Sequence, residues 1–153
     1  MSETLAQTYP AVADSVPRAR RAVVEFARRA GVEEEQVEAV RLAASEAITN
    51  AVRHAYRPDE TGALYVTAAT AGGEFWLLVA DDGHGLDAGS HSPGLGLGLA
   101  LIASICDEFA VLKRAIRGTE LRMRFAVKVR NRQLRGSVRS ATSPARSRFS
   151  TTR

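Results

Sequence analysis

The most constraining feature of this sequence is a helical pattern that runs from about residue 33 to residue 57. Apolar residues recur there at the spacing of one helix face, namely Val37, Val40, Ala44, Ala47, Ile48, Ala51 and Ala55. Glu46, Asn50 and His54 follow one another at steps of four residues, so they line one edge of this apolar stripe. The helix must bury its stripe against a second layer, and it carries polar groups to the boundary of that layer.

The polar edge of this helix needs partners. Burying the side chain of Glu46 or Asn50 without a hydrogen-bond partner costs roughly 1 to 3 kcal/mol. The partners can be protein donors and acceptors, or they can belong to a ligand. This window alone leaves both a structural role and a binding role open.

The remaining periodicities predict two further helices and five strands. The strands are expected at residues 5–12, 64–70, 75–80, 109–115 and 121–127. One helix is expected to start at Asp14 or Ser15, either of which can cap it, and to end at Gly31, and another follows the glycines near residue 98. Helices early in the chain and hairpin-joined strands late in it favour an α+β fold. We expect a single-domain, two-layer α/β sandwich with helices on one face of a mostly antiparallel sheet.

The distribution of charge separates a core from a tail. The whole chain has a net charge of +4, but residues 1–130 hold 15 basic and 17 acidic residues, which gives them a net charge of −2. The other six arginines lie in residues 131–153, which contain no acidic residue and few large apolar ones. We predict a folded domain at 1–130 and a disordered, basic Ser/Arg-rich tail at 131–153. The core is not expected to bind nucleic acid directly, because the excess positive charge belongs to the tail.

Composition also bears on location. No apolar run reaches the roughly 18 to 20 residues of a membrane span, and the first residues lack the basic and apolar regions of a signal peptide. We therefore expect a cytoplasmic protein that does not contact the membrane. The single cysteine, Cys106, excludes an internal disulfide and a cysteine-based zinc cluster.

Two glycine-bearing segments have the chemistry of nucleotide binding. In Asp81-Asp82-Gly83-His84-Gly85, a carboxylate at the end of a buried strand can accept a hydrogen bond from a purine amine, while the glycines let a ring approach the backbone. In Gly94-Leu95-Gly96-Leu97-Gly98-Leu99, three alternating glycines precede a helix whose free N–H groups can receive phosphate. Taken singly, each segment is also compatible with an ordinary turn or a flexible loop.

The order of four motifs is more specific than any one of them. Glu-x3-Asn on a helix is followed by Asp-x-Gly-x-Gly after a strand, by Gly-x-Gly at a helix start, and by Gly118-Thr119 before the final strand. In this order the chain resembles the GHKL (histidine-kinase-like) ATPase superfamily over roughly residues 10–128, and within it the small bacterial anti-sigma-factor serine/threonine kinases. The resemblance implies a Bergerat-type ATP-binding fold with ATP and Mg²⁺ as cofactors.

The resemblance further implies roles for single residues. Glu46 would be the catalytic residue that polarises the attacking nucleophile, and Asn50 would bind Mg²⁺ beside the phosphates. Asp81 would bind adenine, and the Thr119 hydroxyl would support that contact. Other positions would complete the nucleotide site: Gly83 and Gly85 beside the ring, and Gly96, Gly98 and Leu99 in the segment that receives the phosphates. His54 would pack or face the phosphates rather than catalyse.

Two functions from different classes are consistent with this resemblance. As an enzyme, the protein would sequester a sigma factor and phosphorylate an antagonist (anti-anti-sigma) protein on Ser or Thr. As a binding module, it would sequester its partner in a nucleotide-dependent way without turnover. Members of this kinase group can carry an arginine just before the phosphate-side glycines, and residues 91–95 have none. Both functions therefore stay open, as does a homodimer.

Removing residues 131–153 is expected to leave the melting temperature and the nucleotide affinity nearly unchanged, since that segment has too little apolar surface to pack. Thermal unfolding and calorimetry on the full and the shortened chain test this. A clear drop in either quantity would show that the tail docks on the domain.

Overall fold

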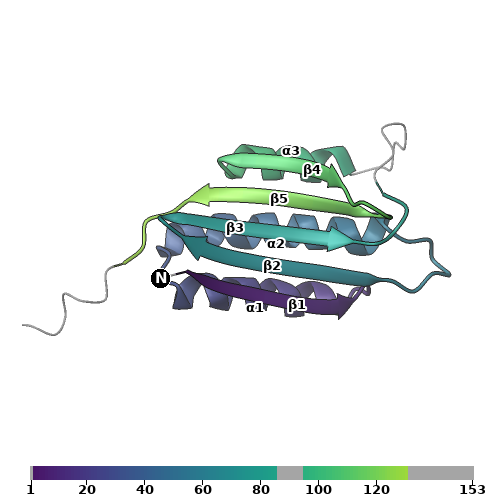
Figure 1. Cartoon of the computed structure of the whole chain (residues 1–153), viewed down its shortest axis with the longest axis horizontal. Helices are drawn as coiled ribbons and strands as arrows, with labels where there is room; N and C mark the ends of the chain where they lie inside the picture. The colour runs from purple at the N-terminus through teal and green to yellow at the C-terminus, as the bar shows by residue number, and fades with distance from the viewer. Residues whose placement is uncertain (1, 86–94, 131–153) are drawn as a thin grey trace, which may run out of the picture.

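The computed structural model describes residues 2–85 and 95–130, which form two layers (Figure 1). One layer is a five-stranded sheet in the order β1-β2-β3-β5-β4. Its strands are β1 (Glu3–Pro10), β2 (Ala63–Ala71), β3 (Glu74–Asp81), β4 (Glu108–Lys113) and β5 (Thr119–Ala126). The helices α1 (Ser15–Arg29), α2 (Glu34–His54) and α3 (Leu95–Ile105) lie together behind the sheet. All four strand pairings of this sheet are antiparallel, so the predicted α+β architecture is confirmed.

The strands alternate between a face buried under the helices and a more open face. In β2, Leu64, Val66 and Ala68 are buried while the residues between them are only half-buried. The same alternation holds in β5, as predicted for the last strand. Strand β1 lies at the edge of the sheet and ends at Pro10, where a missing N–H donor does little harm.

The core is centred on Phe75 of β3, which is fully buried. Its ring contacts Phe26 of α1 and Phe125 of β5, with ring centroids 6.0 Å and 6.3 Å away. Helix α2 packs against α1, α3 and the sheet. Half of its buried residues are alanines, whose small side chains allow these close contacts: Ala43, Ala44, Ala47 and Ala51.

Three local expectations need correction. Asp14 precedes α1 in a helical conformation and makes no side-chain capping bond, and Ser15 is the buried first residue of the helix, so neither residue acts as the expected cap. Helix α2 ends at His54, three residues earlier than predicted. The glycines Gly96 and Gly98 lie inside the first turn of α3 rather than before it.

The described chain ends in contact with the rest of the domain. Val129 forms a bridge with Val32, and the Arg130 N–H donates to the Gly31 carbonyl at 2.8 Å. The predicted tail, residues 131–153, lies outside the described residues. In the part of the chain that is described, no helix has both the length and the apolar character needed to cross a membrane.

The β4–β5 hairpin approaches the end of β3 closely at Gly118. This glycine has φ of +100°, and a Cβ placed on it would lie 2.0 Å from the Asp81 carbonyl oxygen. The hairpin can lie against Asp81 only because residue 118 has no side chain.

Gly118→Ala is therefore expected to destabilise the domain by about 3 kcal/mol, from backbone strain and overpacking together. Gly72→Ala is the matched control, because Gly72 also has positive φ, +59°, but no atom lies within 4 Å of its Cβ position. The control should lose only about 1 kcal/mol. Urea unfolding of both variants measures the difference, and equal losses would refute the close approach.

Candidate nucleotide site

A pocket lies between the second half of α2 and the adjoining ends of β3 and β5. About 330 Å³ of space lies between the lining atoms, part of it open to solvent. Apolar and polar groups share its lining, which consists of Ala47, Asn50, Ala51, His54, Ala55, Val79, Asp81, Gly85, Thr119 and Leu121. The fold thus brings Asn50, Asp81, Gly85 and Thr119 from three separate motifs to one pocket.

Glu46 and Asn50 meet α3 at one end of this pocket. A Cβ placed on Gly98 would lie 3.0 Å from Glu46 Oε2 and 3.5 Å from both amide atoms of Asn50. Asn50 is buried, and its Nδ2 has no hydrogen-bond partner among the described residues. A buried amide without a partner is the arrangement expected of a group that binds a ligand.

Asp81 supplies a carboxylate to the lining of the pocket. It is the last residue of β3, and its Oδ1 accepts a hydrogen bond of 3.0 Å from the Gly83 N–H. Burial raises the pKa of the Asp81 carboxyl, and the backbone N–H groups of Gly83 and Thr119 oppose that effect. Asp81 is thus a buried carboxylate at the end of a strand, close to Thr119, and its contact with adenine stays a prediction.

The glycines of the Asp81–Gly85 turn serve different purposes. Gly85 has φ of +79° and lines the pocket. Gly83 does not line the pocket, and a Cβ there would lie 2.0 Å from the Ala55 carbonyl oxygen. The absence of a Gly83 side chain therefore lets the turn pack on the end of α2, and its role beside the adenine ring stays a prediction.

The phosphate-side segment is also divided in its roles. Gly96 and Gly98 both contribute to the first turn of α3, where backbone N–H groups have no partner within the helix. Gly98 faces Glu46 and Asn50, whereas no atom lies within 4 Å of the Gly96 Cβ position. Leu99 is half-buried and packs against the core. Residues 86–94, which include Gly94 and the segment before it, lie outside the described residues.

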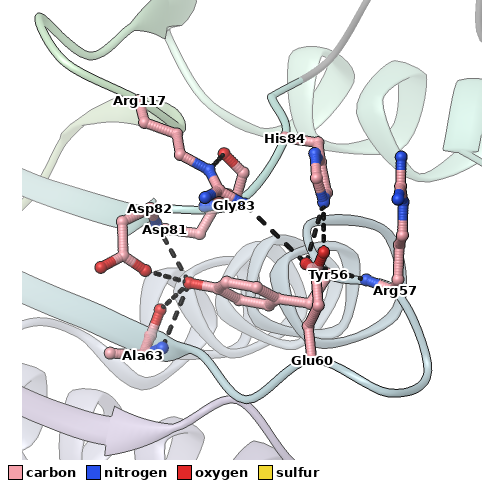
Figure 2. A network of polar contacts seen from close by, with 9 residues as sticks. All are labelled: Tyr56, Arg57, Glu60, Ala63, Asp81, Asp82, Gly83, His84 and Arg117. Atoms are coloured by element: carbon pink, nitrogen blue, oxygen red, sulfur yellow. Dashed lines mark hydrogen bonds and ion pairs between the residues drawn. The ribbon is translucent and has the colours of Figure 1, made fainter.

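Sequence reasoning missed a polar network beside the pocket (Figure 2). His84 Nε2 lies 2.8 Å from both carboxylate oxygens of Glu60, which lowers the pKa of that carboxyl. Arg117 donates from Nε to the Gly83 carbonyl at 2.9 Å and lies 3.8 Å from Glu60. Tyr56, near the end of the helical pattern that contains Glu46 and Asn50, donates a hydrogen bond to the Asp82 carboxylate. Its position just before Arg57-Pro58 was the only available signal.

Comparison with known proteins identifies the family. The sequence model described as the histidine kinase-like ATPase domain matches residues 9–125 of this chain. The chain belongs to this family. Serine-protein kinase RsbW of Bacillus licheniformis is 32% identical over 117 residues, which cover 67% of this chain and 73% of that protein. The anti-sigma F factor of Shouchella clausii (strain KSM-K16) is 28% identical over 130 residues, 78% of this chain and 89% of that one.

A solved structure agrees with the fold of this histidine kinase-like domain. The crystal structure of the RsbU and RsbW domains of a Mycobacterium tuberculosis protein superposes with a TM-score of 0.66 at 25% identity. The match covers 82% of this chain and 32% of that longer one. The predicted family and fold are therefore confirmed, and the likeness to small anti-sigma kinases with them. The roles of single residues stay predictions.

Asp81→Asn tests the base-reading role in this histidine kinase-like domain. The Asn oxygen can still accept from Gly83, so the fold should persist, but the charge-assisted bond to the 6-amino group is lost. ATP affinity should fall by about 1.5 to 3 kcal/mol. The preference for ATP over ITP, which has a carbonyl in place of that amine, should shrink or reverse. Calorimetry with both nucleotides measures this, and an unchanged preference would remove Asp81 from base recognition.

Proposed function

We propose that this protein is an ATP-dependent serine/threonine protein kinase that acts as an anti-sigma factor. It would sequester a sigma factor and phosphorylate an anti-anti-sigma protein, and these partners place its work in the cytoplasm. Its similarity to proteins named RsbW and anti-sigma F factor supports this. The observation that carries the proposal is that Asn50 and Asp81 line the same pocket, while Glu46 and Asn50 both lie close to Gly98 of α3.

The lining of the pocket favours one orientation of ATP. Apolar groups such as Val79 and Leu121 line the part that adenine would fill, next to Asp81. The phosphates would then extend toward Asn50 and the first turn of α3, where N–H groups and the positive end of the helix favour anions. In this orientation the adenine ring would meet apolar groups and the Asp81 acceptor, and the phosphates would meet N–H donors.

The residues at the phosphate end fit a magnesium ion held mainly by the nucleotide. Within residues 2–85 and 95–130, no cluster of three or more His, Cys, Asp or Glu could hold a metal ion. Mg²⁺ needs no such cluster, because it keeps several waters and binds phosphate oxygens together with one or two protein oxygens. The side-chain oxygen of the buried Asn50 can be one of them. Bound there, the ion would shield the negative charge of the phosphates.

Glu46 would act as the base. It lies one helical turn before Asn50 and is half-buried beside Gly98. Its carboxylate would accept the proton of a serine or threonine hydroxyl while that oxygen attacks the terminal phosphorus and ADP leaves.

The alternative, sequestration without turnover, is favoured by the missing arginine in residues 91–95. A homodimer is a further proposal, which light scattering on the purified protein tests.

Glu46→Gln and Asn50→Ala separate catalysis from binding. Glu46→Gln keeps the shape and helix propensity of the side chain, so ATP affinity should persist while phosphate transfer falls by roughly 10²-fold or more. Asn50→Ala should instead weaken Mg²⁺-dependent ATP binding itself. Glu38→Gln is the matched control, because Glu38 lies on the same helix but is exposed and paired with Arg41 at 3.1 Å. Calorimetry and transfer of labelled phosphate to candidate antagonist proteins provide the measurements.

The outcomes distinguish the two functions. Full transfer by Glu46→Gln would remove Glu46 from the mechanism. A wild type that binds ATP but phosphorylates no candidate antagonist would favour the sequestration module, in which partner binding differs between ATP and ADP through differential affinity alone. A wild type without nucleotide binding would refute both.

A further inference from the structure

We propose that Tyr56 and Arg114 are positioning residues that set adenine selectivity by holding the peptide group between Asp81 and Asp82 from its two sides. This inference rests on the proposed ATP site and assigns it two residues outside the four motifs. Neither side chain is expected to touch the nucleotide. Both would act through the backbone that carries the Asp81 carboxylate.

The Tyr56 hydroxyl lies where the β2–β3 ladder stops. Leu64 and Asp81 form the last pair of that ladder, so Ala63 and Asp82 would be the next one. Instead, Tyr56 Oη lies between them and accepts from the N–H groups of both residues at 3.1 Å (Figure 2). Its own proton can go to the Ala63 carbonyl, at 2.7 Å, or to the Asp82 carboxylate. The hydroxyl thus takes the place of the backbone hydrogen bonds that Ala63 and Asp82 would otherwise form with each other, directly after Asp81.

Arg114 holds the other side of the same peptide group. Its Nη1 donates to the Asp81 carbonyl oxygen at 3.0 Å, and its guanidinium lies over the Tyr65 ring, 4.9 Å from the centroid. The N–H of this peptide therefore bonds to Tyr56 and its C=O bonds to Arg114. With both ends fixed, the peptide plane cannot rotate without breaking a hydrogen bond.

Rotation of this peptide would move the carboxylate that reads the base. The Gly83 N–H, which orients Asp81 Oδ1, follows Asp82 directly in the chain. Loss of either bond would therefore loosen both the Asp81 backbone and the donor that aims its side chain. A contact to the 6-amino group of adenine depends on that aim, since hydrogen bonds weaken steeply when misaligned.

The surroundings keep Tyr56 in this place and in its protonated form. A Cβ on Gly62 would lie 2.0 Å from the Tyr56 ring, so the ring fits only because residue 62 is glycine. Burial and the bond to Asp82 raise the pKa of the Tyr56 hydroxyl to about 12, so it stays a donor at neutral pH. Because Tyr56 follows α2 directly, it also fixes the base-reading turn to the helix that carries Glu46 and Asn50.

Tyr56→Phe and Arg114→Met test the proposal through the ratio of ATP to ITP affinity. Each variant removes one hydrogen bond to the peptide group, and each should lower the ratio of ATP affinity to ITP affinity at least about fivefold relative to wild type. Tyr65→Phe is the matched control: the Tyr65 hydroxyl donates to Asp82 Oδ2 at 3.3 Å but makes no bond to this peptide. Its ratio should stay within about twofold of wild type. Circular dichroism and thermal unfolding check that each variant is folded.

The ratio of ATP affinity to ITP affinity distinguishes a role in positioning Asp81 from a role in stabilising the fold alone. A folded Tyr56→Phe with a lower melting temperature but an unchanged ratio would overturn the proposal and leave ATP binding intact. If that variant fails to fold, Arg114→Met decides, because Arg114 is exposed on a hairpin and its loss does not open the core. A wild type that binds neither nucleotide would overturn the proposed function and this inference together.

Discussion

The position of α2 governs the rest of the structure. Its alanine-rich face lets it lie close to the sheet, so its polar edge reaches the same pocket as the ends of β3 and β5. The middle of the helix places Glu46 and Asn50 against Gly98 of α3. Its C-terminal end holds the turn after β3, because the His84 N–H donates to the Ala55 carbonyl at 2.8 Å and Tyr56 bonds to Asp82. Helix α2 thus carries Glu46 and Asn50 and also contacts the turn that follows Asp81.

Side-chain periodicity was sufficient to predict the layers. The apolar stripe of α2 and the alternation in β2 and β5 are local patterns, and burial of one face follows from them directly. The order of the motifs predicted which segments meet, since the family resemblance supplied the topology that connects them. The structure agrees, because one pocket is lined by residues from three of these motifs: Asn50, Asp81, Gly85 and Thr119.

Contacts between distant segments were not predictable from local patterns. Residue 83 must be glycine because the Ala55 carbonyl occupies the space of a side chain, and residue 118 must be glycine because the Asp81 carbonyl does so. Each requirement comes from a backbone segment that is distant in sequence. The role of Tyr56 could not be predicted either, because nothing in the sequence shows that the β2–β3 ladder stops beside it. Local propensity likewise suggested a side-chain cap at Asp14 that the packing of α1 does not use.

The free protein holds two polar groups in unfavourable surroundings, and nucleotide binding would relieve both. Burial raises the Asp81 pKa, so any stability from this group is present at low pH and is lost as the pH rises through the raised value. At neutral pH the ionised carboxylate therefore weakens the free domain. The Asn50 amide adds a second penalty, because its Nδ2 is buried without a partner among the described residues.

Adenine would give the Asp81 carboxylate a donor, and the phosphates with their metal ion would give the Asn50 amide a partner. Both penalties are present only when the site is empty, so their relief adds to the binding free energy of ATP. Asn50 on α2 and Asp81 at the end of β3 both line the pocket, so one ligand must contact both side chains to relieve both penalties. If ATP binds as proposed, a whole nucleotide would therefore bind more tightly than a free base or a free phosphate.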